Sequence, residues 1–354
     1  MRERRPGTRI GPWVVESTLA FGEPTWLAAR KGGEPNVEAI LEVRGPHARS
    51  DVWQARAVAA LQSLDHPAIP SLVQAGRDGD DRYLALRPFG TETLADRLLA
   101  GPVDPRLACT WLFAWADALR HLHAAGWVHG DVAPQHLHVA SDGRVWLMGL
   151  TAAQRIGAPP RDASELPERT LTHLAPEVLA DPQHAPPRAD IYAFGTVAYE
   201  LLAGAPAFPA TAWADRPDQQ RLMLEWKTRH RELDPGASHP DWLRALVRKC
   251  THPDATQRLP DFETIVAWLE ASKPSWAFQQ DLPTPAPIAR GTLPPLRVEP
   301  SFIDHEGLAR AIALEVQRRP DPVPRADLYV LVSAAAGLAL SVLIIAYVEL
   351  SWLG

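Results

Sequence analysis

Lysine and cysteine are scarce in this sequence of 354 residues. Only four lysines occur among 36 basic residues, and the two cysteines, Cys109 and Cys250, lie far apart. That separation gives no disulfide framework and no metal-binding motif, so we expect free thiols buried in a reducing compartment. The net charge of −6 comes without acidic or basic blocks, which leaves no electrostatic case for binding nucleic acid.

The two ends of the sequence differ in hydrophobicity. The first residues, MRERRPGTRIGPW, lack an apolar stretch, so we do not expect them to act as a signal peptide. Near the other end, Leu328–Tyr347 contains no charged residue and is long enough to cross the roughly 30 Å of a bilayer core. A buried helix of a soluble domain is the less favoured alternative. Arg318, Arg319 and Arg325 precede this run and no basic residue follows it. The sequence therefore predicts a single transmembrane helix over 328–348, with the preceding chain in the cytoplasm.

Composition divides the preceding chain into four parts. Residues 11–90 are expected to form strands and turns with one helix, and residues 91–272 mainly helices, from their hydrophobic periodicity and turn residues. Frequent prolines predict a semi-extended linker over 273–303. Residues 304–319 have the apolar stripe of a short amphipathic helix. This helix lies either near the membrane or against the globular part, and the sequence leaves both open.

Five short stretches carry the strongest signal. In chain order they are YLALRPFGTETLADRLL (83–99), WVHGDVAPQHLHV (127–139), HLAPE (173–177), ADIYAFGTVAYELLAGAPAF (189–208) and CTHPDATQRLP (250–260). They resemble the hinge, the catalytic loop, the end of the activation segment, the central large-lobe helix and the last large-lobe segment of a protein kinase. The whole most resembles the bacterial serine/threonine protein kinases of eukaryotic type. Some of these carry one transmembrane helix after the kinase domain.

This resemblance implies an α+β fold with two lobes. A small antiparallel β lobe with one helix would precede a larger helical lobe, and one C-terminal transmembrane helix would follow. The resemblance also implies architectural roles for His129, Glu177, Asp190 and Arg258, with Arg258 placed to pair with Glu177.

Phosphoryl transfer from ATP depends on positioning and charge neutralisation. A strand lysine, oriented by a helix glutamate, grips the phosphates, two side chains hold magnesium, and an aspartate accepts the substrate proton. In the resemblance, the lysine position falls on Leu41 and the helix glutamate position on Gln54. The metal-ligand positions fall on His136 and Gly149. Of the catalytic set, only the aspartate, Asp131, is retained.

Other signals for nucleotide binding are weak. Lys31 adjoins a Gly-Gly turn, so a solvated turn lysine is favoured over a lysine supplied to the cleft from the neighbouring strand. The loop that covers the phosphates keeps Gly22 alone among its glycines. If ATP binds at all, the resemblance assigns Gly22, Ala39 and Phe89 to it. His138 stands where the family has an apolar residue against adenine.

The remaining polar residues of these motifs predict neither a metal site nor a phosphorylation switch. His129, His136 and His138 are interpreted as hydrogen-bonded side chains, because alternation along the strand and loop sends them in different directions. In many kinases an arginine before the catalytic aspartate docks a phosphorylated loop. Gly130 stands there, so phosphate on nearby threonines such as Thr172 should not order the segment through that contact.

The pattern of losses indicates a pseudokinase. Catalytic positions have changed while architectural ones remain, so we expect a membrane-anchored scaffold or allosteric regulator with protein partners, such as an active kinase or a membrane complex. No cofactor or metal is expected, and a homodimer through Ser333 and Gly337 is left open. One alternative is an active atypical serine/threonine kinase that uses Mg-ATP. A third, a small-molecule phosphotransferase, ranks last because such enzymes lack the HLAPE and DIYAFG stretches.

Overall fold

The computed structural model describes part of the chain. The described residues are 5–20, 24–46, 50–99, 101, 103–140, 142–158, 171–208, 218–229 and 232–272. The chain divides into two compact units, 1–286 and 287–354, and all described residues belong to the first. Gly22, the linker 273–303, the helix expected over 304–319 and the span 328–348 with its Ser333 and Gly337 lie outside the described residues. None of the described helices has the length and apolarity to cross a bilayer.

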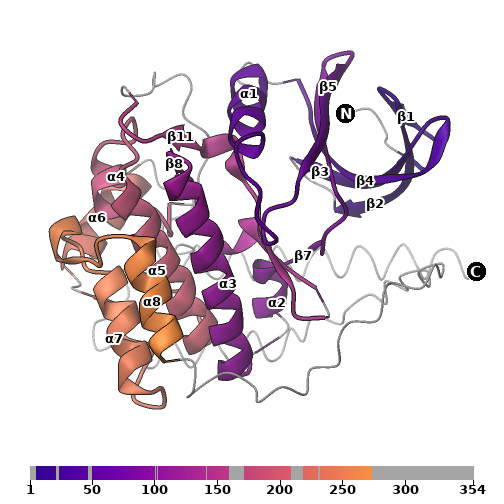
Figure 1. Cartoon of the computed structure of the whole chain (residues 1–354). Helices are drawn as coiled ribbons and strands as arrows, with labels where there is room; N and C mark the ends of the chain where they lie inside the picture. The colour runs from indigo at the N-terminus through magenta and orange to yellow at the C-terminus, as the bar shows by residue number, and fades with distance from the viewer. Residues whose placement is uncertain are drawn as a thin grey trace, which may run out of the picture. The chain divides into compact units, whose positions relative to one another are not determined.

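A six-stranded antiparallel sheet forms the first lobe (Figure 1). Its strands are β1 (Arg9–Ile10), β2 (Trp13–Ala20), β3 (Thr25–Lys31), β4 (Glu34–Arg44), β5 (Leu72–Asp78) and β6 (Asp81–Leu86), in the order β1-β2-β3-β4-β6-β5. Buried and half-buried residues alternate along β3 from Thr25 to Arg30, as the period-2 geometry of a strand requires. This alternation decides which side chains face the second lobe.

One helix, α1 (Ser50–Leu61), packs on this sheet. Asp51 in its first turn forms an ion pair with Arg82 of β6. Farther along, Ala57 and Leu61 are buried together with Leu84 of β6. Polar contacts therefore fix the beginning of the helix, while small and apolar side chains fill the space between helix and sheet.

The second lobe is mainly helical. Its helices are α2 (Leu94–Leu99), α3 (Pro105–Ala124), α4 (Pro176–Ala180), α5 (Pro187–Ala203), α6 (Gln219–Arg229), α7 (Asp241–Cys250) and α8 (Phe262–Ala271). Asp104 caps α3 by accepting hydrogen bonds from the backbone N–H groups of Arg106 and Leu107, and Gly204 ends α5 at φ 64°. An aspartate at a helix N-cap and a glycine just past a helix end are the residue types that these positions favour.

Short strands and turns connect the helices beside the sheet. They are β7 (Glu92–Thr93), β8 (Trp127–Val128), β9 (Leu137–Val139), β10 (Val145–Leu147) and β11 (Gln154–Arg155), with 3-10 turns at Pro134–His136, Leu150–Ala152 and Ala255–Gln257. The strands form a three-stranded sheet β10-β9-β7 and a pair β11-β8. These elements carry the loop that contains Asp131.

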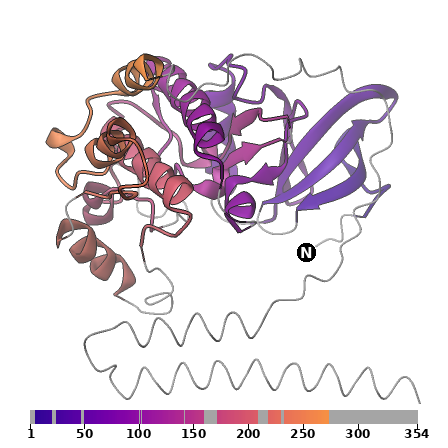
Figure 2. The same cartoon turned by 90° about the horizontal axis from the view of Figure 1, so that it is seen from below.

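Two clusters of buried residues lie on opposite faces of the large sheet, and a third, which includes Leu174, Tyr192 and Phe208, lies within the helical lobe. The larger cluster joins the helices of the second lobe to α1 and to Leu84 and Leu86 of β6. The smaller cluster includes Trp13, Leu27 and Leu41. Figure 2 shows the sheet at one end and the helices at the other. The predicted two-lobed α+β arrangement is confirmed for the described residues.

Candidate functional site

A buried carboxylate on α5 holds the catalytic loop. Asp190 is 1% exposed and accepts hydrogen bonds from the backbone N–H groups of His129, at 2.7 Å, and Gly130, at 2.8 Å. Its Oδ2 also lies 2.8 Å from Nε2 of His123. Burial raises the pKa of Asp190, but the contacts with His123 and Gly130 outweigh it and hold the pKa below its ordinary value. The charge therefore stays in place as a fixed anchor.

The ring of His129 completes this anchor. It is fully buried, with Nε2 2.7 Å from the carbonyl oxygen of Met148. Its Nδ1 accepts a hydrogen bond from the N–H of Asp131 at 3.2 Å. Burial lowers the pKa of His129, so the ring is held neutral. The loop residues 129–131 are thus tied to α5 and to the strand end that precedes Gly149.

Asp131, His136 and Gly149 meet in one place. Nε2 of His136 lies 3.0 Å from Oδ2 of Asp131. The His136 ring covers Gly149: a Cβ atom added there would overlap the ring, with Nδ1 only 2.6 Å away. Gly149 has φ 84°, a conformation that disfavours other residues. The structure thus brings together the predicted catalytic aspartate and both predicted metal-ligand positions. The His136 ring occupies the space that a side chain at residue 149 would need.

An aromatic cluster lies where the sheet meets the second lobe. Trp26 of β3 contacts Phe89, with ring centroids 5.9 Å apart, and His138 of β9, at 5.8 Å. Phe89 and His138 contact each other at 5.3 Å. His138 is buried, its Nδ1 lies 3.2 Å from the carbonyl oxygen of Gly90, and burial lowers its pKa to about 4. These distances are those of direct ring-to-ring contact, so the three rings pack on one another.

The face of β4 that turns toward this cluster differs from the expected one. Leu41 is buried on the opposite face, with Trp13 and Leu27, and Ala39 belongs to the same cluster. Glu42 is the cross-strand partner of Trp26 and therefore shares its face. The expected lysine position thus falls on a residue that faces away from the cluster.

Glu42 is the residue that the sequence interpretation missed. It is 5% exposed, and its Oε1 accepts hydrogen bonds from Nε of Arg44 at 2.8 Å and Nη2 at 2.7 Å. The pair lies within one strand because residues i and i+2 share a face. Side chains alternate between the two faces along β3 and β4, so counting from Trp26 would have placed Glu42 on the face of the aromatic cluster.

In the family, the residue at the position of Gln54 contacts the strand lysine. Here Gln54 contacts backbone groups of two strands instead. Its Nε2 donates hydrogen bonds to the carbonyl oxygens of Gly76, at 3.0 Å, and Tyr83, at 2.8 Å. The α1 residues packed in the main cluster are apolar: Ala57, Val58, Ala60 and Leu61. The helix is thus joined to the strands through backbone groups and apolar packing, and Glu42 has its contact within its own strand.

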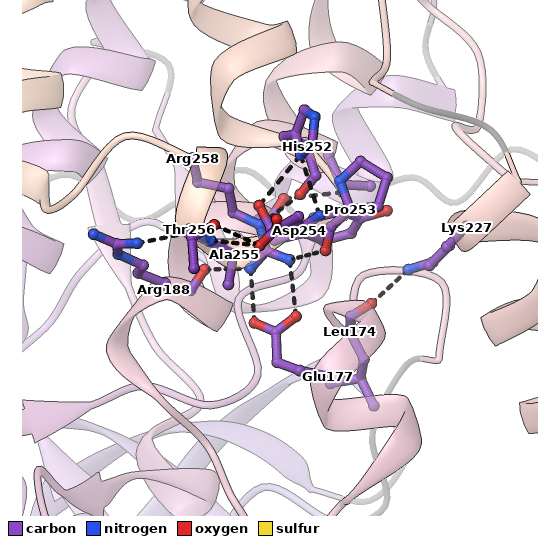
Figure 3. Close-up of polar contacts among 12 residues, drawn as sticks. Leu174, Glu177, Arg188, Lys227, His252, Pro253, Asp254, Ala255, Thr256 and Arg258 are labelled. Atoms are coloured by element: carbon purple, nitrogen blue, oxygen red, sulfur yellow. Dashed lines mark hydrogen bonds and ion pairs between the residues drawn. The ribbon is translucent and has the colours of Figure 1, made fainter.

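Glu177 and Arg258 form the second anchor of the helical lobe (Figure 3). The side chain of Arg258 is fully buried, and its two terminal nitrogens bind both carboxylate oxygens of Glu177 at 2.7 and 2.8 Å. The guanidinium also donates to the carbonyl oxygens of Arg188, His252 and Pro253. A bidentate pair with this many additional bonds is geometrically specific. The structure places the two residues as the resemblance implied.

Two charged residues near the motifs lie at turns. Lys31 ends β3 and its Nζ lies 2.6 Å from Oε1 of Glu34, across the Gly-Gly turn. Asp142 binds the N–H and the Nε of Arg144, at 3.0 and 2.7 Å. Both side chains thus have their contacts within their own hairpins.

Comparison with known proteins decides the family. A sequence model described as "Protein kinase domain" matches residues 39–268, more than half of the chain. The chain belongs to the protein kinase family. The match includes the catalytic loop around Asp131 and both anchors, Asp190 and the Glu177–Arg258 pair, whose contacts are described above.

Several curated relatives are bacterial serine/threonine-protein kinases. PknL of Mycobacterium tuberculosis is 32% identical over 152 residues, which are 43% of this chain and 37% of PknL. PkaB of Streptomyces coelicolor is 35% identical over 158 residues, 41% of this chain and 37% of PkaB. Serine/threonine-protein kinase pkn2 of Myxococcus xanthus is 26% identical over 238 residues, 64% of this chain and 28% of pkn2. The chain thus spans only about a third of the length of these relatives.

Proposed function

We propose that this member of the protein kinase family is a pseudokinase that acts by binding other proteins. The observation that carries the proposal is the contact among Asp131, His136 and Gly149. Magnesium prefers oxygen ligands in octahedral geometry, and the family places two such ligands at residues 136 and 149. Here an imidazole hydrogen-bonded to Asp131 lies over a glycine. The residues present therefore do not fit magnesium.

The aromatic cluster supports the proposal for the rest of the nucleotide. An adenine ring bound as in the family would lie between β3 and the strand that carries His138. Trp26 and His138 already contact each other there, so a purine would have to separate two packed rings. Glu42 adds a buried carboxylate on the same face of the sheet, where the phosphates would need a positive charge. Mg-ATP does not fit this arrangement.

The anchors support a binding role in place of catalysis. Asp190 and the Glu177–Arg258 pair keep the helical lobe folded, so this lobe offers an ordered surface to a partner. Its partners would be proteins, such as an active kinase or another membrane complex. The uncharged run 328–348 would hold this domain on the cytoplasmic face of the cell membrane. Protease added to intact spheroplasts should then leave the domain uncut, and digestion from outside would contradict this orientation.

A phosphotransfer assay tests the central part of the proposal. The full chain would be incubated with magnesium and ATP labelled at the γ-phosphate, with a general protein substrate. Asp131→Asn serves as the matched control, because it removes the one catalytic residue that remains. We expect both proteins to give the same background incorporation. Incorporation that depends on Asp131 would contradict the proposal and favour an active atypical serine/threonine kinase.

A further inference from the structure

Two elements move when protein kinases are switched: the helix that packs on the small-lobe sheet and the activation segment. In this chain they correspond to α1 and to the residues that lead into α4. Among the contacts of each element is a long polar side chain that donates hydrogen bonds to backbone carbonyl groups. Such acceptors are present in the folded chain at all times and do not depend on a nucleotide or a phosphate.

Gln54 holds α1 on the sheet. Its amide nitrogen bridges the carbonyl oxygens of Gly76 and Tyr83, which are cross-strand partners in β5 and β6. Asp51, one turn earlier, pairs with Arg82 of β6. The helix is therefore attached to the β5–β6 pair at two successive turns, and both attachments are independent of the residues around Asp131.

Lys227 of α6 holds the segment before α4. It is 1% exposed, and its Nζ donates to the carbonyl oxygens of Thr172, at 2.7 Å, and Leu174, at 2.6 Å. The last of these contacts is drawn in Figure 3. The amine also lies over the rings of Tyr192, at 4.9 Å, and Phe208, at 4.2 Å. A third, longer contact joins the amine to the carbonyl oxygen of Leu171 at 3.5 Å.

Neighbouring contacts fix the same segment from other sides. Nε2 of His173 lies 3.0 Å from Oε2 of Glu200, and Nδ1 of the same ring lies 3.0 Å from the hydroxyl of Thr172. From α6, Gln220 donates to the carbonyl oxygen of Leu179 at 2.6 Å, so the helix holds both ends of the stretch 171–179. The threonine hydroxyl, a candidate for phosphorylation, is thus already engaged in this network.

We propose that Gln54 and Lys227 are permanent pins that keep α1 and residues 171–179 in one conformation, without nucleotide and without phosphorylation. The inference concerns conformation only. It stands or fails separately from the proposed lack of phosphotransfer, because a pinned domain could be active or inactive.

Hydrogen exchange of the full-length, unmodified chain tests the pins directly. Amides of mobile elements open at lower free energy than those of the core and exchange faster. We expect the helical amides of α1 and α4 to exchange within about tenfold of those in α5, both with and without Mg-ATP. Exchange more than about a hundredfold faster than in α5, or protection that appears only with nucleotide or phosphate, would overturn the proposal.

Matched substitutions assign the effect to the two side chains. Gln54→Leu and Lys227→Met keep the volume and remove the donors, whereas Gln62→Leu and Lys249→Met change exposed residues of the same types. We expect Gln54→Leu to speed exchange in α1, and Lys227→Met in 171–179, by about tenfold or more, with α5 unchanged in each. An equal increase throughout the chain, or the same result from the controls, would contradict the role of pins. If a variant does not fold, the exchange of the unmodified chain still decides.

Discussion

The anchors of the helical lobe and the cleft between the lobes have been built from opposite kinds of contact. At the anchors, buried charges have complete partners: Arg258 binds Glu177 through two nitrogens, and Asp190 accepts two backbone N–H groups. In the cleft, packed rings occupy the space in which the family binds a charged ligand, around His138 and His136. On the proposed function, the chain keeps the internal charge pairs of a kinase fold while residues that would face Mg-ATP have changed.

Burial explains why residues in the cleft can be substituted while those of the anchors are kept. Removing one partner of a buried pair leaves an uncompensated charge and costs several kcal/mol, so the anchors cannot change one residue at a time. Residues that face a ligand have no such internal partner. They can be replaced by aromatic side chains, which gain contact area in the same place.

The largest expected effect comes from breaking an anchor. Glu177→Ala leaves the guanidinium of Arg258 buried without its carboxylate, and we expect a loss of about 4 kcal/mol in the free energy of unfolding. Urea denaturation measures it. The control Glu225→Ala removes a carboxylate from pairs that are largely exposed and should cost less than about 1 kcal/mol. Equal losses in the two variants would remove the distinction between anchor and surface.

A smaller loss in the free energy of unfolding is expected from a substitution at Gly149, where the His136 ring lies. Gly149→Ala places a Cβ against the ring of His136 and forces a side chain into a left-handed conformation, so it should cost about 3 kcal/mol. With His136→Ala in the background, only the backbone strain of about 1 kcal/mol should remain. A double-mutant cycle by urea denaturation measures the difference. Additive losses would mean that the His136 ring does not fill this position.

The pH dependence of stability should sharpen the comparison next. Burial lowers the pKa of His138 from 6.5 to about 4, so below pH 6.5 the unfolded chain binds a proton that the folded chain does not. The free energy of unfolding should therefore decrease as the pH is lowered. This residue alone should contribute a loss of about 2 kcal/mol between about pH 7 and about pH 4.5. His138→Leu should show a correspondingly shallower fall in urea denaturation. An unchanged pH dependence in this variant would show that His138 is not buried in its neutral form.

The smallest effect should come from Asp142, the acid nearest to Gly149 in the sequence. Asp142 pairs with Arg144 in an exposed turn. Asp142→Ala should change the free energy of unfolding by less than about 0.5 kcal/mol. It should also leave any nucleotide response unchanged. A marked change in magnesium response would place this carboxylate in the cleft after all.

The fold could be predicted from the sequence because its signals are local and occur in a fixed order. Asp104 with Pro105 marks the beginning of α3, and Gly204 marks the end of α5. The two residues of the second anchor, Glu177 and Arg258, are 81 residues apart. Only the resemblance to kinases predicted that they would pair. For the described residues, the lobes and both anchors lie where these signals placed them.

The cleft could be predicted only in part, because it depends on register and on contacts between distant strands. A shift of one residue reverses the face of a strand, and the β3–β4 pairing has an irregularity between Arg30 and Lys31. Leu41 pairs with Leu27 and faces away from the aromatic cluster, whereas Glu42 pairs with Trp26 and shares its face. The contact of Trp26 with His138 joins residues from different lobes, and no local pattern in the sequence indicates it.

Binding of Mg-ATP to the full chain tests the central claim most directly. The melting temperature and calorimetric heats would be measured with ATP, with and without magnesium. A ligand of the folded state at a hundredfold excess over its Kd adds about 2.7 kcal/mol of stability, so even modest affinity would be visible. We predict no magnesium-dependent change, because His136 covers Gly149 and the rings of Trp26, Phe89 and His138 are packed together. A micromolar affinity that requires magnesium would contradict the account.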